Sequence, residues 1–190
     1  DHATMHLMSR IFELHDRSNF EIYAYSYGTQ EDDHVTCRIK QVVDVFRDIK
    51  MLNDEEAVDL ARADLIDIAV DLKGYTKDTR VSIFAHGIAP LQLSYLGYPG
   101  SLGAECFDYI IADKILIPDG YERYYSEKIL FMPHSYQCND DRKRISRRQF
   151  TRHELGLPEK SFVFTCFNSN FKITPNEFDV WMRLLLRVKN

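Results

Sequence analysis

The sequence predicts an α/β fold in which helices flank a mostly parallel sheet, followed by the start of a second α/β lobe. Short apolar runs of strand length alternate with helical segments of about 10 residues, and this alternation is typical of βαβ units. The chain of 190 residues is 45% hydrophobic and 28% charged, which suffices for one core and a smaller second unit.

The elements follow from the spacing of apolar residues. Helices are expected where apolar residues recur at helical spacing, at residues 4–16, 31–42, 54–64 and 81–87. Strands are expected in short runs rich in β-branched and aromatic residues, at 20–28, 43–49, 64–72, 91–97, 107–113 and 127–133. The strand at 64–72 is expected to be buried and to stop at Lys73 and Gly74.

Four loops that follow predicted strands are rich in Gly, Pro, Tyr and Ser: 26–32, 71–78, 95–103 and 132–140. In open parallel sheets, ligands bind outside the carboxyl ends of the strands. Small and hydroxylated residues there allow close approach of the backbone and hydrogen bonding to a ligand. The sequence therefore predicts a binding site among these loops.

The chain changes character near residue 140. Residues 140–152 hold six basic side chains and almost no apolar ones, so we interpret 141–152 as a solvated connection between domains at 1–140 and 153–190. A nucleic-acid patch is the alternative, but interleaved aromatic residues are lacking and the net charge of the chain is −5. We therefore expect no nucleic-acid partner.

The second domain is expected to open a new α/β layer. A short helix is predicted at 151–156, a strand at 161–167 and a longer helix at 174–190. Thr174 and Glu177 fit a capping box at the start of that helix, with Pro175 in its first turn. Its apolar stripe is expected to lie in a core: Trp181, Met182, Leu185 and Val188.

Several classes of protein are excluded. No run of about 18 apolar residues exists, so no membrane-spanning helix is expected, and no signal peptide opens the chain. The polar opening without Met suggests a piece of a longer protein. The cysteines are scattered without a CxxC motif, which favours free thiols in the cytoplasm over a zinc ribbon or disulfides: Cys37, Cys106, Cys138 and Cys166.

Two histidines at the start of the chain, His2 and His6, are spaced by one helical turn. A zinc pair would need a third ligand, and neither one nor the HExxH spacing is present nearby, so no metal site is expected. Spacing alone leaves two interpretations open: a catalytic base at a helix start, or surface and capping histidines.

Five blocks, in this order and spacing, resemble the catalytic region of the O-GlcNAc transferases: DHATMHLM, LKGYTKDTR, APLQLSYLGYPGSLGAECFDYIIAD, YYSEKILFMPHSYQ and FNSNFKITPNEFDVWMRLLLRV. The family has a GT-B fold of two Rossmann-like lobes, often joined to tetratricopeptide repeats. The resemblance implies that 1–140 is most of the first catalytic lobe, without its N-terminal strand. It likewise implies that 153–190 begins the second, nucleotide-binding lobe, with repeats elsewhere in the full-length chain.

Such enzymes move N-acetylglucosamine from UDP-GlcNAc to a protein serine or threonine hydroxyl, with inversion and without a metal or cofactor. The resemblance implies the same donor and a protein or peptide acceptor here. It places catalytic roles on His2 and His6, and contact with the UDP phosphates on Lys172. The other substrate-binding positions it implies are Asn168, Ser169, Phe171, Met5, Gly97, Pro99 and Gly100, with Gly74, Tyr75 and Thr76 on the acceptor side.

The chemistry of these residues agrees with the resemblance. An inverting displacement must deprotonate a hydroxyl, and the histidine pKa of about 6.5 suits that task. A lysine one turn before a helix can neutralise a leaving diphosphate. Phe171 stands where relatives carry Tyr, so the ring is kept and the hydroxyl is lost.

The piece alone is expected to be inactive, and the alternative function is a non-catalytic protein-interaction or small-ligand module of the same architecture.

Overall fold

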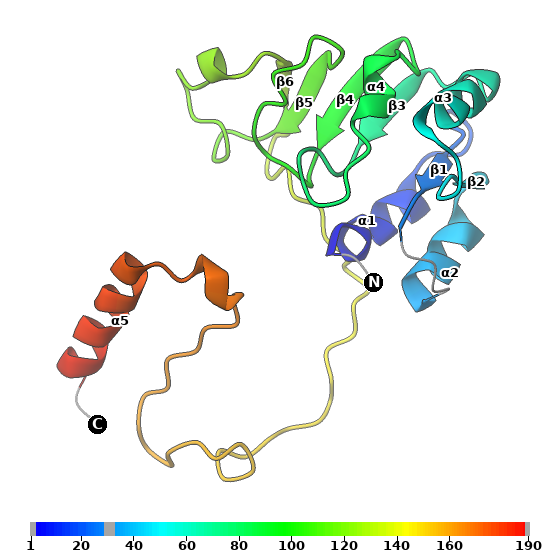
Figure 1. Ribbon diagram of the computed structural model, residues 1–190. Coiled ribbons are helices and arrows are strands. Elements are labelled where there is room, and N and C mark those ends of the chain that lie inside the picture. The colour runs from blue at the N-terminus through cyan, green and yellow to red at the C-terminus, as the bar shows by residue number, and fades with distance from the viewer. Residues whose placement is uncertain (1–2, 29–32, 189–190) are drawn as a thin grey trace. The chain divides into compact units, whose positions relative to one another are not determined.

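The computed structural model describes residues 3–28 and 33–188 (Figure 1). Contacts within the chain divide it into two compact units, Asp1–Lys143 and Arg144–Asn190. All six strands belong to the first unit, and the long helix α5 belongs to the second. The predicted identity of these units as the lobes of a catalytic domain stays a prediction.

The first unit alternates helices and strands as the sequence predicts. Its helices are α1 (Ala3–Leu14), α2 (His34–Val42), α3 (Asp54–Ala63) and the short α4 (Ser82–Ala85). Its strands are β1 (Tyr23–Ser26), β2 (Val45–Asp48), β3 (Ile68–Asp71), β4 (Leu91–Tyr95), β5 (Tyr109–Ala112) and β6 (Lys128–Phe131). A 3₁₀ turn, η1 (Glu122–Tyr124), lies between β5 and β6.

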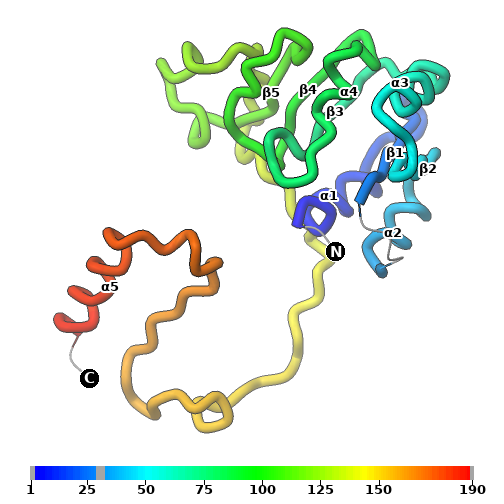
Figure 2. Tube along the Cα trace, in the orientation of Figure 1, coloured from blue at the N-terminus to red at the C-terminus, as the bar shows by residue number. Residues whose placement is uncertain are grey.

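Every strand pair in the described residues is parallel. β1 pairs with β2, and β3, β4, β5 and β6 form a four-stranded sheet in that order. The trace in Figure 2 follows the chain through this sheet in sequence order. The expectation of a parallel α/β fold is confirmed, and because the strands of each sheet run the same way, their carboxyl ends share one edge of that sheet.

Two apolar clusters hold the unit together. The first joins α3 and α4 through Ala57, Val58 and Ile83, with Tyr25 of β1 packed against it. The second lies on β5 and the loop after it and consists of Ile110, Ala112 and Ile117. Helix α3 is well defined because Asn53 and Glu56 form a reciprocal capping box, and Asp33 caps α2 by accepting from the Thr36 N–H.

The prediction that the strand at 64–72 is buried holds for alternate residues only. In β3 only alternate residues are buried: Ala69 and Asp71 point inward, whereas Ile68 is 49% exposed and Val70 is 42% exposed. A nearly continuous apolar run does suggest a strand covered on both faces. In the described residues, one face of β3 is open to solvent. Because side chains alternate between the two faces of a strand, every second residue of β3 is then exposed.

An ion-pair network fastens the end of the first unit to its helices. Arg38 of α2 donates to both Glu13 of α1 and Asp140, and these two carboxylates are 14% and 10% exposed. Arg10 adds a second bond from α1, to Asp141 at 2.9 Å. Hydrogen bonds from Arg38 lower the pKa of both Glu13 and Asp140.

We expect Arg38→Met to lower the melting temperature of the full-length protein by a few degrees near neutral pH. Lowered carboxyl pKa values stabilise the folded state above the ordinary values of 4.5 for Glu13 and 3.8 for Asp140, and this contribution disappears as the pH falls through the lowered values. The difference in melting temperature between wild type and variant should therefore shrink below about pH 4.

Thermal unfolding at several pH values measures this effect. Lys114→Met serves as the matched control, because its partner Asp119 is 88% exposed and a solvated pair contributes little. A difference between wild type and Arg38→Met that stays constant down to the lowest pH would contradict the network's role.

The second unit contains one long helix, α5 (Pro175–Arg187), preceded by the 3₁₀ turn η2 (Asn170–Lys172). Thr174 and Glu177 form the predicted capping box, with Pro175 in the first turn. The predicted strand at 161–167 is wrong, and so is the predicted helix at 151–156, where the chain forms turns instead. A single strand without a neighbour leaves its backbone groups unpaired, so it does not persist.

The expectation that the apolar stripe of α5 lies in a core is also wrong. No residue between 144 and 188 is buried. Trp181 is only half-buried, and the rest of the stripe is exposed: Met182 36%, Leu185 55% and Val188 37%. An amphipathic helix needs an apolar surface to pack against, and residues 144–188 do not provide one.

Candidate functional site

A buried carboxylate shapes the loop after β3. Asp71 is 5% exposed, and its two oxygens accept the backbone N–H groups of Lys73 and Gly74, each at 2.9 Å. Burial raises the pKa of this carboxyl, and the two N–H groups act in the opposite direction. The Thr76 hydroxyl donates to the Lys73 carbonyl oxygen at 3.1 Å. The predicted acceptor-side residues Gly74, Tyr75 and Thr76 therefore share one fixed turn.

The loops after β3 and β4 touch so closely that only glycine fits at two positions. A Cβ atom on Gly97 would lie 2.2 Å from the carbonyl oxygen of Leu72. Gly74 has a φ of +56°, and its Cβ atom would lie 2.4 Å from the Cβ of Tyr98. The rings of Tyr75 and Tyr98 also meet, with centroids 5.7 Å apart. The structure thus brings the predicted donor-side and acceptor-side loops together.

A second buried carboxylate, Glu127, holds the far side of the loop after β4. It is 4% exposed and accepts the Ser101 hydroxyl and the Leu102 N–H, each at 2.7 Å. The Tyr125 hydroxyl donates to the carbonyl oxygen of Pro99 at 3.1 Å. This loop carries three predicted donor-side residues: Gly97, Pro99 and Gly100.

A third buried carboxylate holds the loop after β6. Asp113, which directly follows β5, is 6% exposed and accepts the N–H of Tyr136 at 2.8 Å. The carbonyl oxygen of Tyr136 accepts the Tyr95 hydroxyl at 2.6 Å. Hydrogen bonds from the backbone N–H groups of Leu116 and Tyr136 lower the pKa of Asp113. Each of the three loops is therefore fixed by an acidic side chain withdrawn from water.

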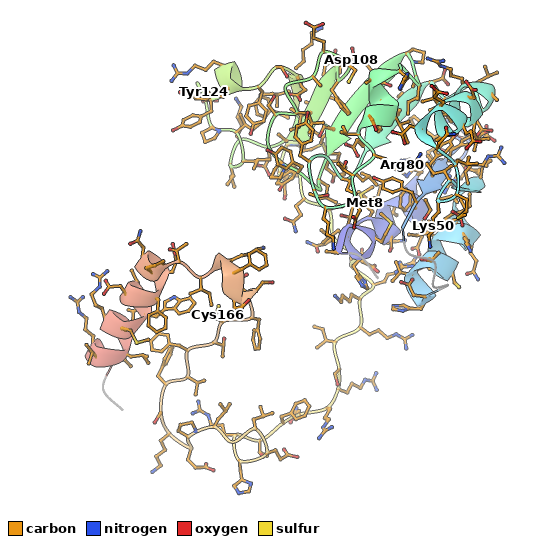
Figure 3. The ribbon with its side chains drawn as sticks, in the orientation of Figure 1. Met8, Lys50, Arg80, Asp108, Tyr124 and Cys166 are labelled. Carbon is orange, nitrogen blue, oxygen red and sulfur yellow. The ribbon has the colours of Figure 1, made fainter. Side chains whose placement is uncertain are left out.

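Helix α1 is attached to the same edge. The sulfur of Met8 lies 3.4 Å from the sulfur of Cys138, two residues after Tyr136, and Met8 is 6% exposed (Figure 3). Figure 1 shows that α1 begins on the side toward which the arrowheads of β4 and β5 point. The start of α1 and the loops after β3 and β4 therefore lie at the same edge of the sheet.

The predicted histidines differ in what the structure shows of them. His6 of α1 is half-buried, and its ring centroid lies 6.2 Å from that of His34, the first residue of α2. Met5 is half-buried beside it on α1. His2 lies outside the described residues, so its place and its catalytic role stay predictions.

The structure adds a cluster at this edge that the sequence analysis did not identify. The ring of Tyr27, which directly follows β1, lies 5.3 Å from the Lys73 ammonium and 5.8 Å from the Arg80 guanidinium (Figure 3 labels Arg80). Arg80 is fixed in turn by Asp54 at 2.7 Å and by the carbonyl oxygen of Ile49 at 2.8 Å. Spacing along the sequence could not predict this cluster of aromatic and charged side chains near the ends of β1 and β3, because its members come from four separate segments of the chain.

The remaining predicted residues lie in the second unit and are exposed. Asn168, Ser169, Phe171 and Lys172 precede α5, and Phe171 is 80% exposed. The Lys172 N–H donates to the Ser169 carbonyl oxygen at 3.0 Å, closing the η2 turn. This segment leads directly to the capped start of α5 at Thr174, as the sequence predicts.

The described residues lack the features of a metal site and of a membrane span. Within residues 3–28 and 33–188, no three His, Cys, Asp or Glu side chains gather as a metal site would require. None of the helices in the described part of the chain is long and apolar enough to cross a bilayer. None of the four cysteines, which all lie in the described residues, forms a disulfide.

A parallel α/β unit with loops fixed at the carboxyl edge of its sheet defines the class of α/β proteins that bind ligands at that edge. Within that class, the model of glycosyl transferase family 41 matches residues 1–150, and the chain belongs to that family.

Relatives extend over the whole chain. It is 34% identical over its full length to a probable UDP-N-acetylglucosamine–peptide N-acetylglucosaminyltransferase, SEC, of Arabidopsis thaliana. It is 29% identical over its full length to the probable transferase SPINDLY of rice, Oryza sativa subsp. japonica. In each case the chain spans only 20% of the relative's length.

A solved structure shows the same fold. A mutant of Thermobaculum terrenum O-GlcNAc transferase superposes on 97% of this chain with a TM-score of 0.86 and 31% sequence identity. The chain covers 34% of that protein. The GT-B assignment of the fold is thereby confirmed.

Proposed function

We propose that the full-length protein containing this chain transfers N-acetylglucosamine from UDP-GlcNAc to serine or threonine hydroxyls of a protein. The observation that carries this proposal is the match, over 97% of the chain, to a solved O-GlcNAc transferase. The fixed loops after β3 and β4 support it, because a sugar-nucleotide donor needs a rigid backbone surface where the strands end.

The proposed reaction inverts the sugar centre and needs no metal. A histidine at the start of the chain, His2 or His6, takes the proton of the attacking hydroxyl as the bond to the diphosphate breaks. Lys172 places positive charge on the leaving UDP, where negative charge grows in the transition state. Neutral imidazole is the form that acts as a base, so the proposed role requires an unprotonated ring.

Substrate contacts are assigned by position. Met5, Gly97, Pro99 and Gly100 face the sugar nucleotide together with Asn168, Ser169 and Phe171, and Gly74, Tyr75 and Thr76 face the acceptor. The proposal also includes a cytoplasmic location and tetratricopeptide repeats elsewhere in the full-length chain, as the resemblance implies.

Isothermal titration of UDP and UDP-GlcNAc against the full-length protein tests the proposal. We expect both to bind in the presence of EDTA, and slow hydrolysis of UDP-GlcNAc. Absence of binding by both nucleotides would instead favour a non-catalytic interaction module.

His2→Ala is expected to lower transfer by about 10²–10⁴-fold, the usual contribution of a general base, with an unchanged melting temperature. His6→Ala is the matched comparison, because it removes an imidazole one helical turn away. Initial rates of transfer to a peptide acceptor measure both variants. Normal transfer by His2→Ala with a large loss in His6→Ala would assign the base to His6, and normal transfer by both would remove the histidine mechanism.

A further inference from the structure

The side chain of Glu127 is almost fully buried. From the sequence alone, Glu127 is only the first residue of the predicted strand at 127–133. Its side chain reaches across 25 positions of sequence to the Leu102 N–H and across 26 to the Ser101 hydroxyl, both at 2.7 Å. With 4% of Glu127 and 3% of Leu102 exposed, this contact is shielded from solvent. A buried charge of this kind is retained only when hydrogen bonds compensate it.

Ser101 is the centre of the contact. Its hydroxyl oxygen donates to Glu127 and also accepts the N–H groups of Gly103 at 3.1 Å and Ser126 at 3.2 Å. The Tyr125 hydroxyl reaches the same loop at Pro99. We call residues 97–103 the glycine loop. Residues 125–127 therefore hold the glycine loop at three positions: Pro99, Ser101 and Leu102.

The opposite side of the glycine loop is held by the loop after β3. The Tyr75 hydroxyl donates to the carbonyl oxygen of Leu102 at 2.7 Å. Gly97 lies against the backbone of Leu72 with no room for a Cβ atom. Leu102 is thus bonded through its N–H to Glu127 and through its carbonyl oxygen to Tyr75, which fixes the orientation of that peptide unit from both sides.

We propose that Glu127 is a positioning residue of the transferase: its buried carboxylate fixes the glycine loop in the shape that receives the sugar nucleotide. This inference rests on the proposed function, because it takes the ligand of the loop to be UDP-GlcNAc. Glu127 touches no reacting atom and acts through Ser101 and Leu102. Misplacing a binding loop by about 1 Å can cost about a hundredfold in rate.

Three variants separate positioning from general stability. Glu127→Ala leaves the Leu102 N–H and the Ser101 hydroxyl without their acceptor. Glu127→Gln can still accept from Leu102 through its carbonyl oxygen, but its amide nitrogen cannot accept the Ser101 hydroxyl, whose oxygen already accepts from Gly103 and Ser126. Ser101→Ala removes the hydroxyl while leaving the carboxylate on Leu102, and it guards against a Glu127→Ala protein that does not fold.

The assay is hydrolysis of UDP-GlcNAc by the full-length protein, with UDP titration and thermal unfolding alongside. We expect Glu127→Ala to raise KM for UDP-GlcNAc and Kd for UDP at least tenfold, and Ser101→Ala to raise both severalfold at an almost unchanged melting temperature. Glu127→Gln, which keeps the bond to the Leu102 N–H, should recover part of the loss. Glu122→Ala is the matched control, since Glu122 bonds Lys114 and Gly120 outside this contact.

The inference is overturned if Ser101→Ala and a folded Glu127→Ala protein keep the wild-type KM and Kd, or if Glu122→Ala weakens donor binding as much as they do. A wild-type protein that neither binds UDP nor hydrolyses UDP-GlcNAc would overturn the proposed function, and this inference with it. An active wild type with unaltered variants would overturn the inference alone.

Discussion

Lys172→Ala in the full-length protein is expected to lower the rate of transfer by about 10²–10³-fold, comparable to removing one electrostatic contact from a transition state. The reaction has to stabilise negative charge on the leaving UDP, and in the proposed mechanism no metal shares that task. Lys172 precedes α5, whose positive N-terminal dipole would act in the same direction. The loss should appear mainly in kcat, because charge on the diphosphate grows as the bond breaks.

Steady-state kinetics with UDP-GlcNAc and a peptide acceptor measure this loss. Lys160→Ala is the control, since it removes an exposed lysine from the same unit. Lys172→Arg keeps the charge and should retain more activity than Lys172→Ala. Equal rates for Lys172→Ala and Lys160→Ala would show that the diphosphate is stabilised by other groups.

Gly97→Ala is expected to destabilise the first unit by about 3 kcal/mol, at the upper end of the range for overpacking. The added methyl group would lie 2.2 Å from the Leu72 carbonyl oxygen and 2.8 Å from the Cα of Lys73. Both are backbone atoms, which cannot rotate away as a side chain would. The loops after β3 and β4 would have to separate, so donor binding should weaken as well.

Thermal unfolding and UDP titration measure the two effects. Gly28→Ala is the matched control, because a Cβ atom there meets nothing within 4 Å. That variant should stay within about 0.5 kcal/mol of wild type. A Gly97→Ala protein as stable as Gly28→Ala would show that the two loops are not tightly packed in solution.

Local signals in the sequence predicted most of the first unit. Alternation of apolar runs with helical segments located all six strands of the described residues, and the positions of Thr174 and Glu177 marked the start of α5 because capping depends on residues only three apart. The predictions that are wrong needed distant partners. Strand 161–167 and the core stripe of α5 require a sheet that residues 144–188 do not supply.

The candidate site shows the same division. The loops at the carboxyl edge were predictable, since topology alone places them there. The groups that fix the loops were not: Asp71, Asp113 and Glu127 are single acidic residues whose burial depends on the packed fold. An acidic residue near the end of a strand is usually exposed to solvent, so its position in the sequence does not predict that it will be buried and fix a loop.

Asp71 and Asp113 also give the site an order of response to acid. Burial raises the pKa of Asp71, whereas backbone N–H groups lower that of Asp113. On acidification Asp71 therefore takes up its proton first, and the turn at Gly74 loses its charged acceptor while Tyr136 is still held. Acid would thus loosen the acceptor side ahead of the segment that anchors α1, and an inhibitor selected at low pH would meet a differently shaped surface from one selected at neutral pH.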